Sequence, residues 1–135
     1  NNAPEGIELF HGYTYSGHPL ASAAAIASLD LYQEEGLFDR ARSLEEAWAN
    51  AVHAMKGTRH VIDCRNFGLI GGIELEPRPG APTKRAMEIF HRAFDEGLLI
   101  RVTGDIIALS PPLIIWREQI DELVDTLRGA IRRHA

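Results

Sequence analysis

A stretch near the start of the chain constrains the fold most, because between Leu20 and Leu29 only Ser22 and Ser28 are polar. Pro19 directly precedes this stretch, and proline is favourable in the first turn of a helix, so we expect a helix to begin there. A helix that is apolar on nearly all sides must be covered on most of them. A chain of 135 residues has room for one core. We therefore expect part of the cover to come from missing sequence or from another subunit.

Composition excludes several classes of protein. Hydrophobic residues make up 45% of the chain and charged residues 24%, which is ordinary for a globular domain. The formal net charge of −5 and the scattered arginines argue against a nucleic-acid surface. The single cysteine, Cys64, excludes an internal disulfide and a metal site built on thiolates. No apolar run reaches the roughly 20 residues that a membrane-spanning helix needs. We expect a cytoplasmic protein that binds neither nucleic acid nor membrane.

The rest of the chain alternates between helical and strand periods. Apolar residues at spacings of three and four predict helices over about 37–56, 83–96 and 117–133. We expect the helix over 83–96 to turn Ala86, Met87, Phe90 and Phe94 inward. A period of two predicts strands within 60–76 and 98–109, each pair joined by a tight turn. The order of elements predicts an α+β fold, a small and mainly antiparallel sheet with helices packed on one side.

The first strand pair carries two further signals. Ile62 and Cys64 alternate with Asp63 and Arg65, so we expect the first two inside and the last two as a solvated or interfacial pair. Gly71 and its neighbour Gly72 suggest a bulge or a close approach of another group to the backbone.

Three motifs in order resemble class III aminotransferases. Phe10 to Pro19 ends in His-Gly-Tyr-Thr-Tyr-Ser-Gly-His-Pro, which is similar to the loop of the ω-amino-acid:pyruvate and amine:pyruvate branch. Residues 61–75 resemble the strand pair of that family, and residues 98–113 resemble its C-terminal hairpin. The resemblance implies a fold-type-I enzyme that uses pyridoxal 5'-phosphate (PLP), usually a homodimer with active sites between subunits. It divides the chain into a cofactor-phosphate loop and entry segment, 1–19, and a C-terminal small domain, 20–135, preceded by an interface helix.

The same resemblance assigns roles to residues of the loop. The threonine that matches Thr14 binds the PLP phosphate of the other subunit, and a hydroxyl and loop N–H groups ahead of a helix suit a dianion. We expect Tyr13 to lie beside the cofactor with Thr14, and Tyr15 to line the mouth of the substrate pocket. Without the resemblance, Thr14 would be an ordinary turn residue.

Arg101 is the candidate that binds substrate. It stands between Ile100 and Val102, where a buried and unpaired guanidinium would be too costly, so it must reach solvent or an acid. The family's matching arginine binds the substrate carboxylate, and a planar guanidinium suits bidentate contact. The alternative is an edge-strand arginine paired with Asp105 or with a glutamate.

No catalytic residue is expected in this chain. The family's lysine that binds PLP covalently lies upstream of the threonine loop, and Lys56 and Lys84 lie in polar surroundings at helix ends. Zinc binding by His11 and His18 is disfavoured, because no carboxylate stands at ligand spacing.

The sequence leaves three functions open. The chain is the C-terminal portion of a transaminase that is inactive alone, a stand-alone small-molecule binding or regulatory module, or a dimerisation domain. The start of the chain, which lacks an initiator methionine, favours a connection inside a longer polypeptide.

Overall fold

The computed structural model describes residues 12–133 and forms two compact units, Asn1–Glu35 and Gly36–Ala135. The first unit contains one helix, α1 (Pro19–Glu34). Pro19 occupies its first turn, and the Nδ1 atom of His18 accepts a hydrogen bond from the Ala21 N–H at 3.4 Å. These two features begin the helix at the residue that the sequence predicts.

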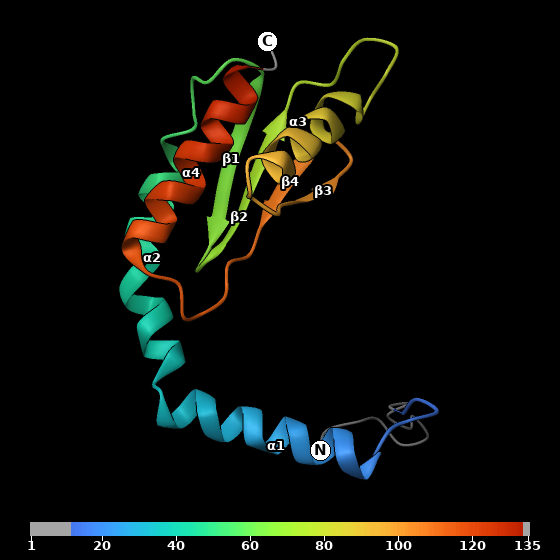
Figure 1. Cartoon of the computed structure of the whole chain (residues 1–135), viewed down its shortest axis with the longest axis vertical. Helices are drawn as coiled ribbons and strands as arrows, with labels where there is room; N and C mark the ends of the chain where they lie inside the picture. The colour runs from blue at the N-terminus through green and yellow to red at the C-terminus, as the bar shows by residue number, and fades with distance from the viewer. Residues whose placement is uncertain (1–11, 134–135) are drawn as a thin grey trace, which may run out of the picture. The chain divides into compact units, whose positions relative to one another are not determined.

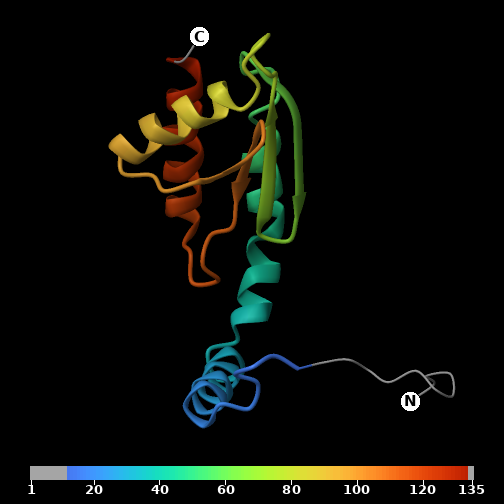
Figure 2. The same cartoon turned by 90° about the vertical axis from the view of Figure 1, so that its right-hand side faces the viewer.

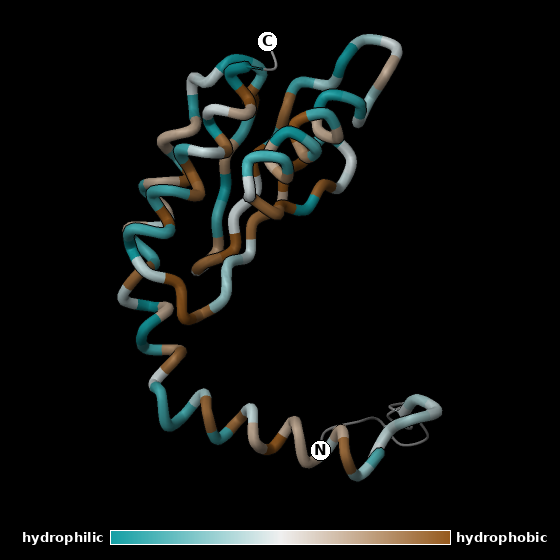
Figure 3. The backbone as a smooth tube through the Cα atoms, viewed as in Figure 1, coloured by the Kyte–Doolittle hydropathy of each residue, from teal (hydrophilic) through white to brown (hydrophobic). Residues whose placement is uncertain are grey.

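The side chains of α1 are uncovered. None of its residues is buried within the described chain, although hydrophobic segments recur along its whole length (Figure 3). Leu20, Ile26 and Leu29 are among its large exposed side chains. The helix therefore cannot be held by apolar packing within the described residues, and this leaves open the prediction that other polypeptide covers it.

The second unit is an α+β layer (Figure 1). In chain order its elements are α2 (Leu37–His53), β1 (Val61–Phe67), β2 (Ile70–Leu75), α3 (Lys84–Asp95), β3 (Arg101–Thr103), β4 (Ile106–Leu109) and α4 (Arg117–Arg132). The strands form one sheet in the order β1-β2-β4-β3, with every neighbouring pair antiparallel. The three helices lie on the same side of this sheet (Figure 2). The predicted fold class is confirmed.

The core lies between the sheet and these helices. Trp48 and Val52 of α2 are fully buried against β2, where Gly71 has no side chain. A Cβ atom at Gly71 would lie 3.1 Å from Cγ2 of Val52 and 3.2 Å from Cζ2 of Trp48. The close approach predicted at this glycine is confirmed, and it lets α2 pack directly on the strand. The largest fully buried side chains of the other elements are Met55, Ile73, Leu75, Ile89, Ile107, Ile120, Leu127 and Ile131.

The prediction that Ile62 faces the core is wrong. Cys64 is buried, as predicted, but Ile62 is 59% exposed. The pairing of β1 with β2 shifts register between Val61 and Asp63, so one extra residue stands in β1. A bulge of this kind turns the extra residue away from the alternation of its neighbours.

The inward face predicted for the third helix is right for Ala86, which is buried, and for Phe90, which packs against the core, and wrong for Met87 and Phe94. Met87 and Phe94 are 40% and 60% exposed, whereas Ile89 and Ala93 are buried. Arg85 is buried in their company, and its Nε donates a hydrogen bond to the Glu76 carbonyl at 2.9 Å. This hydrogen bond joins the first turn of α3 to the residue that follows β2, and Arg85 is buried beside Ala86.

The last helix begins without a serine or threonine cap. The Trp116 N–H donates to the side-chain oxygen of Gln119 at 2.9 Å, which satisfies one N-terminal donor of α4. The guanidinium of Arg40 lies 4.3 Å from the centre of the Trp116 ring, and its Nη2 donates to the Ile115 carbonyl at 2.7 Å. Arg40 thus joins α2 to the start of α4. Among the described residues no helix is long and apolar enough to cross a membrane.

Candidate functional site

The loop before α1 is a tight turn with an exposed tip. The Tyr13 N–H donates to Oγ of Ser16 at 2.7 Å, and the Ser16 N–H donates to the Tyr13 carbonyl at 2.9 Å. Gly17 has φ of +77°, a conformation that glycine adopts at little cost. Ser16 therefore forms the turn, while Tyr13, Thr14 and Tyr15 are exposed on it. The structure brings these three sequence-predicted residues together in one loop of the first unit.

The side chain of Thr14 is exposed on this turn. Its hydroxyl forms no hydrogen bond with any residue in the range 12–133. The turn leads into the N-terminus of α1, where the helix dipole favours negative charge. No acidic residue occurs between Gly12 and Leu29, so nothing in this stretch repels an anion. His11, the other histidine of the motif, lies outside the described residues.

The second unit has one face of its sheet free of helices. Because side chains alternate along a strand, the buried residues Ile73 and Ile107 place their neighbours on this open face. The open face carries Asp63, Arg65 and Phe67 of β1, Ile70, Gly72 and Glu74 of β2, Ile106 and Ala108 of β4, and Arg101 and Thr103 of β3.

Arg101 is exposed at the edge of this face. It pairs in register with Ala108 of β4, whose small side chain leaves the guanidinium unobstructed on that side. Asp105 does not pair with it; instead, a carboxylate oxygen of Asp105 accepts the Thr83 N–H at 2.9 Å. Within the described part of the chain no hydrogen bond or ion pair holds the Arg101 guanidinium. The arginine is thus placed to receive a carboxylate from outside.

A pocket of about 620 Å³ opens beside Arg101, where the chain before β3 separates from the chain after β4. Apolar side chains supply most of its wall, including Leu99, Leu109 and Ile115, and Gln119 and Glu122 of α4 lie at its far side. Arg101 is the only basic residue of this lining. The pocket offers apolar surface next to a single cation.

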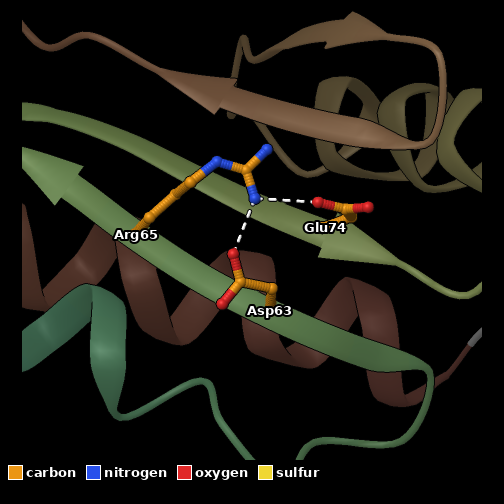
Figure 4. Close-up of polar contacts among 3 residues, drawn as sticks. All are labelled: Asp63, Arg65 and Glu74. Atoms are coloured by element: carbon orange, nitrogen blue, oxygen red, sulfur yellow. Dashed lines mark hydrogen bonds and ion pairs between the residues drawn. The ribbon is translucent and has the colours of Figure 1, made fainter.

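Three charged residues form a network elsewhere on the open face (Figure 4). The Nη1 atom of Arg65 donates to a carboxylate oxygen of Asp63 at 2.7 Å and to one of Glu74 at 2.8 Å. The hydrogen bond from Arg65 lowers the pKa of the Asp63 carboxyl, and the bonds to Glu74 and then Asp63 raise the pKa of Arg65. Two carboxylates against one guanidinium leave the network with one net negative charge.

Sequence reasoning found part of this network. The alternation of β1 predicted that Asp63 and Arg65 share a face, and the structure confirms this pair. It did not predict that Glu74 joins them, because that contact depends on the register of β1 against β2. Gly72, opposite Arg65, was a usable signal: an added Cβ there would lie 3.5 Å from Cγ of Arg65. The arginine therefore lies flat across β2 toward Glu74.

Neither lysine of the chain has a catalytic setting. Lys56 follows α2 and Lys84 begins α3, and both are exposed. Within the same described range, no group of three or more His, Cys, Asp or Glu residues could hold a metal ion.

Comparison with known proteins identifies the family. The family model described as aminotransferase class-III matches residues 2–131. The chain is 63% identical over 131 residues to an omega-aminotransferase of Caulobacter vibrioides, a match that covers 97% of this chain and 30% of that protein. It is 37% identical over 127 residues to the omega-amino acid–pyruvate aminotransferase of Pseudomonas putida, covering 94% and 28% respectively. The chain thus spans about 30% of the length of these relatives.

Solved structures show the same fold. A thermostable omega transaminase mutant from Pseudomonas jessenii is similar with a TM-score of 0.84 and 28% identity, over 94% of this chain and 30% of that one. The adenosylmethionine-8-amino-7-oxononanoate aminotransferase of Methanocaldococcus jannaschii matches with a TM-score of 0.82 and 31% identity, over 93% and 30%.

Class III aminotransferases depend on PLP, and the described residues fit part of what this cofactor requires. The exposed hydroxyl of Thr14, ahead of a helix N-terminus and in a stretch, 12–29, that contains no acid, fits the phosphate. The exposed Lys56 and Lys84 do not fit the covalent attachment. With a family model that covers residues 2–131 and relatives that agree with it, this chain belongs to the class III aminotransferases.

Proposed function

We propose that this chain is the C-terminal portion of a homodimeric transaminase that moves an amino group from an ω-amino acid or amine to pyruvate or a similar keto acid. Residues 1–19 serve as the cofactor-phosphate loop and entry segment, and residues 20–135 as the C-terminal small domain. The names of the Caulobacter and P. putida relatives support this assignment, as does a β-alanine–pyruvate aminotransferase of Pseudomonas aeruginosa that is 36% identical over 125 residues, covering 93% of this chain and 28% of that protein.

The observation that carries the proposal is the exposed guanidinium of Arg101, for which the described chain provides no acid. We assign it to the carboxylate of the keto acid or amino acid, because two parallel N–H donors match two carboxylate oxygens. A simple arylalkyl amine has no carboxylate and gains nothing from this contact. Arg101 thus separates two kinds of substrate in one enzyme.

The loop residues hold the cofactor in this proposal. Bound PLP supplies the electron sink for the transfer of the amino group. Thr14 donates its hydroxyl to the phosphate of the cofactor in the partner subunit, and Tyr13 lies beside it. Tyr15 lines the mouth of the substrate pocket. These residues bind and orient, and the proton transfers belong to a lysine outside the 135 residues, so the chain alone is inactive.

The test is the Arg101→Ala variant of the full-length enzyme, assayed in separate half-reactions at the cofactor absorbance. With β-alanine or pyruvate, kcat/KM should fall by about 10²–10³-fold, which corresponds to roughly 3–4 kcal/mol. With an arylalkyl amine it should change by less than about tenfold. Arg101→Lys should recover little, because an ammonium cannot match both oxygens.

Equal losses for amine and carboxylate would remove Arg101 from the substrate site and leave it as scaffold. A full-length protein that binds PLP but transfers no amino group from any donor would contradict the proposed activity itself. A dimerisation role alone, which the uncovered α1 favours as the second candidate, would then remain.

A further inference from the structure

Two opposite charges that lack partners line the pocket beside β3. Glu122 of α4 is exposed, and within residues 12–133 its carboxylate forms no hydrogen bond or ion pair. The Arg101 guanidinium lines the same pocket of about 620 Å³ and also has no partner in that range. An unpaired cation and an unpaired anion in one lining attract each other.

The other polar side chains at the α4 side of this pocket already have partners. A carboxylate oxygen of Glu96 accepts a hydrogen bond from Nη2 of Arg133. The side-chain oxygen of Gln119 accepts the Trp116 N–H at 2.9 Å. Of the acids that the described residues contribute to the lining, Glu122 is therefore the one that remains for Arg101.

The wall between the two charges suits the side chain of an arginine. Leu99 and Leu123 contribute apolar surface to it, and the small Ala108 pairs in register with Arg101. The aliphatic part of an arginine packs on such surface while its guanidinium reaches a polar partner. β3 is the edge strand of the sheet, so no further strand of the described chain separates Arg101 from the pocket side.

We propose that Glu122 determines substrate specificity by holding Arg101 on the pocket side when the bound substrate has no carboxylate. This inference rests on the proposed function, in which Arg101 binds the carboxylate of the substrate. A bidentate contact with that carboxylate is stronger than an exposed ion pair, so a keto acid or ω-amino acid draws Arg101 away from Glu122. An arylalkyl amine does not. The pair with Glu122 then keeps the guanidinium from lying unpaired against the apolar group of the amine, which would be costly.

The Glu122→Gln variant of the full-length holoenzyme tests this role. We compare kcat/KM for β-alanine with kcat/KM for an arylalkyl amine in separate half-reactions. Their ratio should rise about two- to fivefold in favour of β-alanine, the shift that an exposed ion pair gives to a two-state equilibrium. The change should lie in KM rather than in kcat, because Glu122 acts on the position of Arg101 and not on the reacting atoms.

Glu118→Gln is the matched control. It removes the same charge from the same helix, but Glu118 does not line the pocket, so the ratio should stay as in wild type. An unchanged ratio in Glu122→Gln, or an equal change in Glu118→Gln, would overturn the proposal.

A double variant shows whether Glu122 acts through Arg101. In the Arg101→Ala background, the further change Glu122→Gln should leave the ratio unaltered, because the side chain that Glu122 holds is gone. A further change of the ratio by about twofold or more, the lower end of the effect expected for the pair, would show that Glu122 acts by another route and would overturn the proposal.

A contact measurement separates this inference from the proposed activity. Arg101→Lys places a primary amine on β3 of the full-length holoenzyme, and a water-soluble carbodiimide joins an amine and a carboxylate in contact as an amide, taking up the released water as a urea. Without substrate, mass spectrometry should find an amide between positions 101 and 122 and none between positions 101 and 118. This amide in a protein that transaminates no donor would uphold the pair and contradict the activity. Its absence from an active transaminase would contradict the pair alone.

Discussion

The two units of the chain differ in the burial of their hydrophobic residues. In the second unit, Trp48 and Ile73 are fully buried between the sheet and three helices. In the first unit, α1 is at least as apolar along its sequence, yet none of its residues is buried by the described chain. The second unit can therefore be stable from its own contacts, whereas α1 requires a surface that the described residues do not supply.

This difference shows which apolar surfaces the described chain leaves uncovered. Apolar surface favours folding only when it leaves water, at roughly 25 cal/mol per Å². The uncovered α1 and the uncovered hairpin end of the sheet both need a neighbour, and the relatives have polypeptide to provide it. The comparison predicts that the same kind of substitution lowers the free energy of unfolding by different amounts in the two units. It also predicts a difference between the 135-residue chain and the full-length dimer.

The largest expected effect is a truncation in the core of the second unit. In the 135-residue chain, Trp48→Ala should lower the free energy of unfolding by about 3–5 kcal/mol, the usual cost of emptying a buried aromatic site. Leu29→Ala in α1 should stay within about 0.5 kcal/mol of wild type, because the side chain is already in water. Urea unfolding of both variants measures this. A Leu29→Ala cost as large as that of Trp48→Ala would show that α1 is covered within this chain.

The next largest effect is expected for a charged substitution in α1 of the full-length dimer. Ile26→Asp should cost about 2–4 kcal/mol there, because it puts an unpaired carboxylate into an apolar contact. Gln33→Asp adds the same charge at a polar position of the same helix and is the control. Thermal melts and size-exclusion chromatography report stability and dimer content. If both variants behave like wild type, α1 is not an interface helix.

Thr14→Ala in the full-length enzyme should weaken PLP binding by about 1.5–3 kcal/mol, the scale of one hydrogen bond to a charged group. Thr14→Ser keeps a hydroxyl and should recover most of it. Mixed dimers show whether Thr14 serves the cofactor of its own subunit or that of its partner. In them, a Thr14→Ala subunit is paired with one that lacks the catalytic lysine. The lysine-bearing site belongs to the Thr14→Ala subunit and should bind PLP normally, because its phosphate receives the hydroxyl from the partner. Impaired binding at that site would mean that Thr14 serves its own subunit.

The smallest effect concerns the network on the open face. The Arg65 hydrogen bond holds the pKa of Asp63 below its ordinary 3.8, so its stabilising contribution is present above that pH and is lost as the pH falls through the lowered value. Asp63→Asn should lower the Tm of the 135-residue chain by about 1 °C at pH 7, with the difference vanishing as acid protonates the Asp63 carboxylate. Thermal melts across this range check it. A difference that grows on acidification would contradict this assignment.

Local pattern predicted the fold better than it predicted the faces. The element types and the antiparallel sheet followed from period and turn residues, as in the hairpins closed by Gly68 and Gly104, both with positive φ. The exposure of Ile62 could not be predicted, because a bulge in β1 is set by the partner strand. The periodicity of α3 predicted Ala86 and Phe90 as inward but missed the burial of Arg85, whose hydrogen bond to the Glu76 carbonyl satisfies a charged group that composition alone places in solvent.

The candidate site also contains one feature that the local sequence could predict and one that it could not. The exposure of Thr14 in a loop ahead of a helix could be predicted from its local sequence, since turn and helix start are local. That Arg101 has no acid partner among the described residues could not be predicted, because the direction of the Asp105 carboxylate, which accepts the Thr83 N–H across 22 positions of sequence, depends on the tertiary fold. The roles proposed for Thr14 and Arg101 in one reaction depend on polypeptide that the described chain does not contain.

The most direct test of the account is where PLP becomes covalently attached. The 135-residue chain and the full-length protein are each incubated with PLP, reduced with borohydride and mapped by mass spectrometry. The account predicts one stoichiometric adduct in the full-length protein, at a lysine outside these 135 residues, and none in the chain alone. A stoichiometric adduct at Lys56 or Lys84, accompanied by turnover, would contradict it.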